Sequence, residues 1–394
     1  MKKLLCTLLC MTTLWIYAQN EVVVTTITSE FSGSGGISID SEGNLFIADF
    51  GDFLGMADPD GIPNNILQLD TDLNLTVYAT DFIGASGNDF DSEGTLYQSD
   101  IRASAIYKIV DGERILVTAT GIVAPVGIVF DSNDNFYVCN CGNNTIRKVT
   151  PDGTSTQFAS GDMFTCPNGI TVDEDDNLYV SNFANPDIIK ITPDGTITKI
   201  GETFSGNGHI DYDPNTRNLY IASYGGHQIF YLNIDNPVMT DLAGTGVRGN
   251  DDGAGETATF STPNGIAVSD DGTTIFVNCA VPLDGAVINP QILRQIDITL
   301  SVNDTDLGIN QVKTYPNPVT DVFTIETELP INTNNITIKI IDMVGKVVMD
   351  IRDISPENTT LKQSIDISEM ATGNYIYTIS NDSKQLYSGQ LIKK

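Results

Sequence analysis

The sequence predicts an all-β protein with two folded parts, a β-propeller of six blades followed by a smaller β-domain. A motif of the form Gly-Ile-x-Val-Asp recurs with a spacing of about 40 residues, which is typical of propellers and other repeat folds. Asp-Gly and Pro-Asp-Gly turns separate short apolar runs, and 35 glycines suit a chain rich in tight turns. The repeat stops near residue 300, and 394 residues exceed one typical domain.

The N-terminus has the pattern of a secretory signal peptide. Met1, Lys2 and Lys3 precede an apolar stretch that ends near Tyr17, and cleavage is expected after Ala18. This stretch is too short to span a bilayer, and no later segment approaches about 20 consecutive apolar residues. We therefore expect residues 1–18 to be removed on export and the mature chain to have no transmembrane segment.

Six copies of the repeat are expected between residues 19 and 300. Four clear copies begin at 36–40, 127–131, 169–173 and 265–269, and two degenerate copies begin near Gly87 and Gly208. Each copy reads as an inner strand, an acidic turn and three further strands, which is the blade of a propeller. The last copy lacks an outer strand, and the β-branched segment 21–29 is predicted to complete it.

A second domain follows a polar linker predicted over residues 301–312. Residues 313–394 contain alternating apolar segments separated by turns, which is typical of strands. This part is expected to be a small β-sandwich.

The repeat resembles known families of propellers. Segments such as Pro167-Asn-Gly-Ile-Thr-Val-Asp173, followed by Asn177-Leu-Tyr-Val180, are similar to NHL repeats and to the senescence marker protein/gluconolactonase superfamily. The resemblance covers roughly residues 21–300 and implies a six-bladed propeller.

The C-terminal part resembles the type A sorting domain of type IX secretion cargo, an Ig-like β-sandwich. The resemblance rests on four separated segments in the expected order: 315–319 (Tyr-Pro-Asn-Pro-Val), 336–342, 370–377 and 391–394. It implies recognition by the type IX secretion machinery and a secreted or outer-surface location.

Charge narrows the choice of partners. The formal net charge is −31, and residues 19–312 contain 10 Lys and Arg against 41 Asp and Glu. Such a surface repels phosphate backbones and anionic lipid, so nucleic acid is not an expected partner. A small molecule, a glycan or a peptide remains open as the ligand.

A metal site is one hypothesis for the propeller channel. The loops before the inner strands and those after the second strands are expected to open on one face, the default ligand site. The gluconolactonase resemblance nominates Asn168, Asn207 and Asn264 as ligands of a divalent cation, Ca²⁺ or Zn²⁺. Gly35 stands where those enzymes carry a Glu, which departs from the family pattern.

Acid–base groups are the second part of that hypothesis. Asp49 and Asp100 end second strands and are candidate general bases, although Asn and Asp in such loops most often stabilise turns. His209 and His227 are the two histidines of the chain and fall in the fifth copy. They could serve a lyase, while His227 also fits a packing position of NHL repeats.

The cysteines indicate a structural role. Four remain after signal removal: Cys139, Cys141, Cys166 and Cys279. Export permits disulfides, and neighbouring copies place Cys141 near Cys166, so a bond between them is expected. Cys139 and Cys279 are predicted to be buried apolar residues. Acidic turns such as 174–177 lack the spacing of an EF-hand and are interpreted as hairpins.

Three functions therefore remain open from the sequence. The first is a recognition module that uses the channel face, the second is a metal-dependent hydrolase such as a lactonase or a related lyase, and the third is a structural adhesin.

Overall fold

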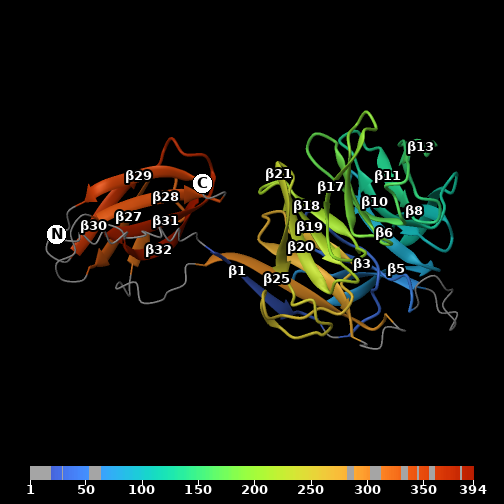
Figure 1. Ribbon diagram of the computed structural model, residues 1–394, viewed down its shortest axis with the longest axis horizontal. Helices are drawn as coiled ribbons and strands as arrows, with labels where there is room; N and C mark the ends of the chain where they lie inside the picture. The colour runs from blue at the N-terminus through green and yellow to red at the C-terminus, as the bar shows by residue number, and fades with distance from the viewer. Residues whose placement is uncertain are drawn as a thin grey trace, which may run out of the picture. The chain divides into compact units, whose positions relative to one another are not determined.

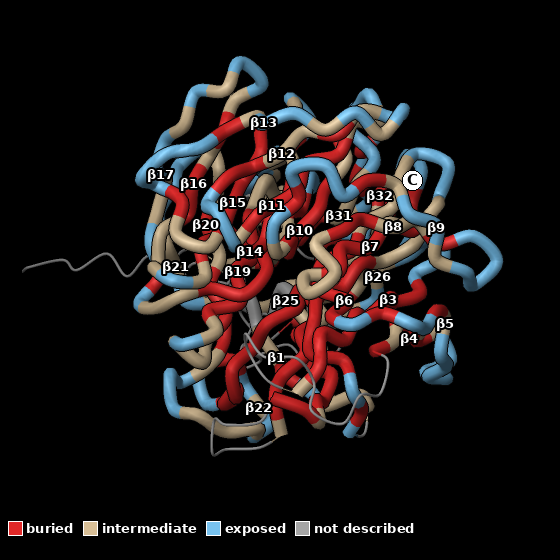
Figure 2. The backbone as a smooth tube through the Cα atoms, turned by 90° about the vertical axis from the view of Figure 1, so that its right-hand side faces the viewer, coloured by how far each residue is buried: buried red, intermediate tan, exposed pale blue. Residues whose placement is uncertain are grey.

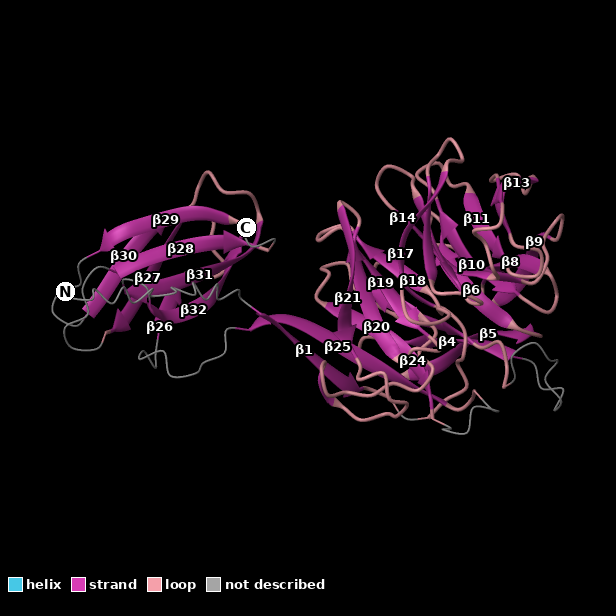
Figure 3. Ribbon diagram, viewed as in Figure 1, coloured by secondary structure: helices cyan, strands magenta, loops and turns pink. Residues whose placement is uncertain are grey.

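The computed structural model describes residues 19–28, 30–52, 64–281, 288–301, 312–329, 336–343, 346–354, 360–381 and 384–394. Within these ranges the regular secondary structure consists of strands, and no helix is present (Figure 3). The chain divides into two compact units, one of which is Glu21–Thr299 while the other contains Leu300–Lys394. The predicted signal peptide lies outside the described residues, as does the predicted linker apart from its two end residues.

The first unit contains five antiparallel four-stranded sheets in which strand order follows chain order. Sheet 1 comprises β2 (Ile37–Ile39), β3 (Leu45–Ala48), β4 (Asn64–Leu69) and β5 (Leu75–Phe82). Sheet 2 comprises β6 (Ala85–Phe90), β7 (Leu96–Asp100), β8 (Ala105–Val110) and β9 (Glu113–Thr118). Sheet 3 comprises β10 (Pro125–Phe130), β11 (Phe136–Asn140), β12 (Thr145–Val149) and β13 (Ser155–Ser160). Sheet 4 comprises β14 (Pro167–Val172), β15 (Leu178–Asn182), β16 (Asp187–Ile191) and β17 (Ile197–Glu202). Sheet 5 comprises β18 (Ile210–Asp213), β19 (Asn218–Ser223), β20 (Gln228–Asn233) and β21 (Asn236–Ala243).

Sheet 6 joins the two ends of this unit. Its order is β22 (Gly253–Ala254), β1 (Gln19–Thr26), β25 (Gln291–Ser301), β24 (Thr274–Ala280) and β23 (Ile266–Val268). The N-terminal strand therefore completes the last copy of the repeat, which confirms the prediction from the sequence. Figure 1 shows β1 and β25 running side by side.

A buried cation fixes this closure. Arg294 on β25 has a fully buried side chain and donates to the backbone oxygens of Thr259 and Asp251, at 3.0 and 2.9 Å. It also pairs with the Asp252 carboxylate at 2.8 Å. That carboxylate accepts from the backbone N–H and the hydroxyl of Thr26 on β1. One arginine thus links the C-terminal strand to the N-terminal strand.

The first strands of the six sheets form a ring of contacts. β2 contacts β6, β6 contacts β10, β10 contacts β14, β14 contacts β18, β18 contacts β23, and β23 contacts β2. These inner strands approach closely because most carry glycine at the first position of the motif. A Cβ at Gly87 would lie 2.4 Å from the Val126 oxygen, and one at Gly127 would lie 2.5 Å from the Asn168 oxygen. The architecture is that of a propeller, with its blades packed around the inner strands.

Apolar residues fill the space between neighbouring sheets, and the exposed positions lie mainly on turns and outer strands (Figure 2). One such cluster joins Val129, Tyr137 and Cys139 of sheet 3 to Ile170 and Val180 of sheet 4. Cys139 and Cys279 are both free and fully buried, as the sequence predicted.

The acidic turns are held by their own aspartates. In the turn after β14, the Asp173 carboxylate accepts from the backbone N–H groups of Asp175 and Asn177 and from the Tyr179 hydroxyl. Asp131 has the same set of partners after β10. These hydrogen bonds explain much of the acidity of the repeat without a bound cation.

The C-terminal unit contains two antiparallel sheets. One has the order β26 (Val312–Tyr315), β27 (Val322–Glu328) and β30 (Thr360–Asp366). The other has the order β29 (Val347–Ile354), β28 (Ile336–Asp342), β31 (Gly373–Asn381) and β32 (Lys384–Lys393). Residues of both sheets, including Phe323, Ile338 and Tyr377, share one core.

Candidate functional site

A cavity of about 710 Å³ runs along the inner strands of the propeller unit and extends to the turns that follow them. All six inner strands contribute to its wall, and Ser132, Glu174, Pro214 and Asp270 contribute from the turns. The lining contains several carboxylates and no Lys or Arg. It is therefore an acidic cavity.

His209 lies where the inner strands come closest. The first position of the motif is Gly36, Gly87, Gly127, Gly169 and Gly265 in five sheets, and it is His209 in sheet 5. A Cβ at Gly36 would lie 2.9 Å from His209 Cε1, so the imidazole of sheet 5 lies against the backbone of sheet 1. The single large side chain at this level occupies space that the glycines leave open.

Burial determines the charge of this imidazole. The side chain is 8% exposed, and burial lowers the pKa of His209 to about 4, so the ring is neutral near pH 7. Its Nε2 is buried and has no hydrogen-bond partner among the described residues. A neutral imidazole offers one donor and one acceptor.

Two carboxyl groups face the cavity from sheets that are three places apart in the ring of six. Asp89 on β6 accepts from the backbone N–H of Phe90 and, at 3.0 Å, from that of Phe130 in the next sheet. Asp211 on β18 accepts from Tyr212 N–H and, at 2.8 Å, from Val268 N–H in the next sheet. The two aspartates thus occupy equivalent positions on opposite inner strands.

The pKa of both carboxyl groups is raised, which favours their neutral form. Burial, with a smaller contribution from the charge of Asp211, raises the pKa of Asp89 to about 7. Burial raises the pKa of Asp211 to about 6, and the neighbouring Asp213 adds to the effect. Protein surrounds Asp89 and Asp211. Each still has a partly accessible surface, because it borders the cavity.

Two more polar atoms in the cavity wall have no partner. The Ser38 hydroxyl and Asn88 Oδ1 are buried and make no hydrogen bond to any described residue. Asn88 donates its amide nitrogen to the Phe46 oxygen at 3.2 Å, which fixes its orientation and leaves the amide oxygen as the unpaired atom. Three orphaned polar atoms, on Ser38, Asn88 and His209, therefore belong to one cavity.

Asp49 and Asp100 have a different environment. The Asp49 carboxylate accepts from the hydroxyls of Ser32 and Ser34, from Gly51 N–H and from Asn289 Nδ2, all within 3.1 Å. Asp100 accepts from the N–H groups of Ile83 and Ala103. Neither residue lines the cavity.

The same contact recurs along the second strands. Asp49, Asp100, Asn140 and Asn182 each accept a hydrogen bond from the residue 17 positions earlier in the chain. These side chains hold the loop that leads into the inner strand of their own sheet. The turn-stabilising role considered from the sequence accounts for them.

The three asparagines nominated as metal ligands also lie outside the cavity lining. Asn168 Nδ2 donates to the Asn207 oxygen at 3.0 Å, and Asn264 Nδ2 donates to the Ser34 oxygen at 2.6 Å, so each links its sheet to the next. Asn207 accepts from the Thr203 hydroxyl through Oδ1, and its Nδ2 is buried without a partner among the described residues. The amide oxygen of Asn207 is therefore used within its own loop, whereas Asn168 and Asn264 use their amide nitrogens for these bonds.

No group of three or more His, Cys, Asp or Glu side chains with the geometry to hold a metal ion occurs in the described part of the chain. The structure does not bring Asn168, Asn207 and Asn264 together with Asp49 or Asp100 around the cavity.

His227 joins two sheets. His227 has a left-handed φ of 56°, and its Nδ1 accepts from Thr262 N–H at 3.2 Å. Ser104 and Asn144 have the same backbone conformation and accept from Ala124 and Cys166 in the same way. His227 is thus one of a repeated set of side chains, here called latches, that accept a hydrogen bond from a backbone N–H of the next sheet. Of the two histidines, only His209 lines the cavity.

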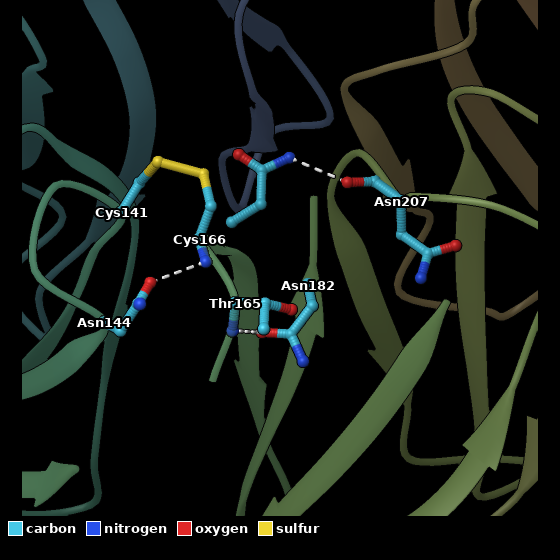
Figure 4. The surroundings of a disulfide bond; sticks show 7 residues. Cys141, Asn144, Thr165, Cys166, Asn182 and Asn207 are labelled. Atoms are coloured by element: carbon cyan, nitrogen blue, oxygen red, sulfur yellow. Dashed lines mark hydrogen bonds between the residues drawn. A yellow bond between two sulfur atoms is a disulfide. The ribbon is translucent and has the colours of Figure 1, made fainter. Parts of the chain in front are cut away.

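Cys141 and Cys166 form a disulfide between the loops of sheets 3 and 4 (Figure 4). The bond lies beside the Asn144 latch, where Asn144 Oδ1 accepts from Cys166 N–H at 2.8 Å. Figure 4 also shows Asn182 holding Thr165. The disulfide adds a covalent link to a junction that this hydrogen bond also holds.

Comparison with known proteins divides the chain in the same way. Residues 313–394 match the family described as the secretion system C-terminal sorting domain. The chain therefore carries a type IX sorting domain and is exported to the cell surface or secreted. No helix of the described residues is long and apolar enough to cross a membrane.

Solved structures resemble the propeller unit. A structural genomics protein of unknown function from Bacteroides thetaiotaomicron is 15% identical over 71% of this chain and 76% of that chain, with a TM-score of 0.57. An auxiliary nutrient binding protein from Bacteroides ovatus is 16% identical over 71% and 77%, with a TM-score of 0.56. A gluconolactonase from Xanthomonas campestris is 14% identical over 70% and 89%, with a TM-score of 0.51. At these identities the likeness establishes the fold alone. The search of curated protein sequences returned no significant match.

Proposed function

We propose that this protein is an exported recognition module, a closed propeller of six blades that binds a small polar ligand in its central cavity. The observation that carries the proposal is the cavity of about 710 Å³, whose lining contains Asp89 and Asp211 on opposite inner strands and three residues with an orphaned polar atom, Ser38, Asn88 and His209. Buried polar atoms without partners are rare in folded proteins, so such a group indicates a place where a ligand or water is bound.

The remaining parts of the chain fit this function. Residues 1–18 act as the signal peptide, and the linker at 301–312 connects the propeller to an Ig-like sorting domain that the type IX machinery recognises. The nutrient-binding protein of similar fold supports a binding role for a propeller of this kind. The acidity of the propeller unit argues against a nucleic-acid partner.

A hydrolase or lyase is the second function to consider, because a gluconolactonase shares the fold and Asp89 has its pKa near 7. A carboxyl group that titrates at neutral pH is suited to general acid–base catalysis. The metal-dependent version is less well supported, since the proposed ligands and bases Asn168, Asn264, Asp49 and Asp100 are engaged in holding loops and sheets.

Ligand binding by residues 19–394 tests the proposal. We would screen glycan, peptide and small-molecule libraries by thermal shift and calorimetry, comparing the parent chain with the Asp89→Asn/Asp211→Asn double variant. Asp72→Asn is the matched control, because Asp72 is an exposed turn residue remote from the cavity lining. Binding that the double variant loses and the control retains supports recognition. Turnover of lactones that survives chelation and needs Asp89 would replace recognition with catalysis.

A further inference from the structure

We infer that the ligand of this cavity carries a protonated amine, held between Asp89 and Asp211. The inference rests on the proposed binding function and specifies the chemical class of the ligand. It follows from three features of the cavity wall: its charge, its unpaired acceptors and its apolar residues.

The charge of the wall is uncompensated. Asp89 and Asp211 accept hydrogen bonds from backbone N–H groups, and neither has a Lys or Arg partner among the described residues. Four of the other acidic residues of the lining are engaged elsewhere. Asp131 and Asp173 hold their own turns, Asp176 accepts from Ser132, and Glu174 pairs with Arg217 and accepts from the Tyr212 hydroxyl. Asp270 lies in the turn after β23, outside the inner strands. Asp89 and Asp211 are thus the carboxyl groups of the inner-strand wall that lack a counter-charge.

The cavity lining also contributes an unpaired acceptor, Asn88 Oδ1, although Asn88 bonds to sheet 1 and Asp89 to sheet 3. Asn88 Oδ1 precedes Asp89 on the same strand, and its amide nitrogen is already bonded to Phe46. Each carboxylate oxygen of Asp89 and Asp211 accepts one backbone hydrogen bond, and Asp211 Oδ1 also accepts from the Thr171 hydroxyl at 3.4 Å. A carboxylate has about four acceptor sites, so both groups keep acceptor capacity. An ammonium group has three N–H donors and no acceptor, so it complements a wall that is short of donors.

Apolar side chains line the same cavity as the carboxyl groups. The position after the aspartates is Phe90 in sheet 2 and Tyr212 in sheet 5, and Phe130, Val172 and Val268 occupy it in other sheets. A metal ion gains nothing from such neighbours, and a hard cation would need more oxygen ligands than the opposed pair supplies. An organic cation can contact the aromatic and aliphatic side chains with its carbon atoms while its charge pairs with the carboxylates.

The charge of the pair depends on pH. Cation binding favours ionised carboxylates, so amine affinity should rise between pH 5 and pH 8 as Asp211 and then Asp89 lose their protons. The groups that surround the pair are Asp91, Asp131, Asp173, Glu174, Asp176, Asp213, Asp270 and the neutral His209. Alkylamines have a pKa near that of lysine, about 10.4, and stay protonated over this range.

Matched pairs of probes test the inference on residues 19–394. Calorimetry would compare 1,5-diaminopentane with 1,5-pentanediol, and cyclohexylamine with cyclohexanol, at pH 5 and pH 8 in moderate salt. We expect at least one amine to bind at least ten-fold more tightly than its neutral counterpart and more tightly at pH 8. Asp89→Asn and Asp211→Asn should each weaken that binding about ten-fold, whereas Asp72→Asn should not.

The outcomes separate this inference from the proposed function. Neutral probes that bind as tightly as the amines, with the same sensitivity to Asp89→Asn, would overturn the amine while leaving a recognition cavity in place. Amine binding that is unchanged in both variants, or equally weakened in Asp72→Asn, would assign it to the acidic surface and overturn the inference. If neither the probes nor the libraries bind, both proposals fail. The pH dependence of the parent chain provides a readout that does not require the variants to fold.

Discussion

Asp100 and Asp89 lie on adjacent strands of the same sheet, yet they differ in what their carboxyl groups can do. Asp100, at the end of β7, is fully buried and accepts from the loop that leads into its own sheet. Asp89, on the inner strand β6, borders the cavity and has its pKa raised to about 7. In this fold the end of the second strand stabilises the blade, and the middle of the inner strand is where a side chain can meet a ligand.

The largest expected effect comes from removing a carboxylate of the first kind. Asp49→Ala deprives two serine hydroxyls, Gly51 N–H and Asn289 Nδ2 of their acceptor in a buried site. Leaving buried donors unpaired should lower the free energy of unfolding by about 3 kcal/mol. Urea denaturation measures this, and Asp72→Ala, an exposed control, should change little. Equal stability of the two variants would remove the distinction between the two kinds of aspartate.

The two histidines provide the next comparison. His227→Ala removes the acceptor of Thr262 N–H at a half-buried latch, and we expect a loss of about 1 kcal/mol of stability. Ligand binding should be unchanged, because His227 does not line the cavity.

His209→Ala should change ligand binding more than it changes stability. It removes the imidazole that lies at the level of the glycines, so affinity for the cavity ligand should change at least several-fold. Calorimetry on both variants decides the matter. A binding defect in His227→Ala that exceeds the one in His209→Ala would place the site at the loops instead of the cavity.

The pH dependence of stability separates Asp89 from the turn aspartates. Its folded pKa of about 7 exceeds the value of about 3.9 expected in an unfolded chain. The folded state therefore holds the proton more tightly, and this contribution to stability is present at pH 4 and is lost as the pH rises through 7.

Asp89→Asn should accordingly flatten the thermal stability profile between pH 4 and pH 7. Melting temperatures at intervals of half a pH unit would show this. The parent profile should persist in Asp72→Asn, and a difference in melting temperature between the parent and Asp89→Asn that stays constant over this interval would contradict the raised pKa of Asp89.

The smallest loss of stability is expected from a residue in the turns at the rim of the cavity. Ser132 donates its hydroxyl to Asp176 at 2.7 Å in an exposed latch between sheets 3 and 4. Ser132→Ala should cost about 0.5 kcal/mol, because water can replace an exposed partner. Chemical denaturation resolves this from the Asp49 effect, and a loss as large as that of Asp49→Ala would show that the rim latches hold the blades together.

Local chemistry made the repeat and its turns predictable. The Asp-Gly and Asp-x-x-x-Asn segments fold through hydrogen bonds within five residues, so the sequence alone places them. The completion of sheet 6 by the N-terminal strand was also predictable, because a copy with too few strands needs a partner.

The candidate site was less predictable. The role of Asp49 depends on a residue 17 positions away and on Asn289, which no local pattern reveals. Asp89 and Asp211 lie in the two copies that depart most from the repeat, and for that reason they were not predicted as site residues from the sequence. A signal was present nonetheless, since aligning the copies places these aspartates where the other sheets have Ser38, Val129, Thr171 and Ala267.

The position of β1 has a consequence for the order in which the unit forms. β1 pairs with β22, as in the register of Val23 with Ala254, and its other neighbour is β25. The first strand to be synthesised therefore waits for β22, at Gly253–Ala254, before it has any partner in its sheet. Contacts so distant in sequence slow folding, since long loops must close before the contact contributes. The five other sheets can pair locally while the chain is still growing, and the ring closes only after nearly the whole unit has been made.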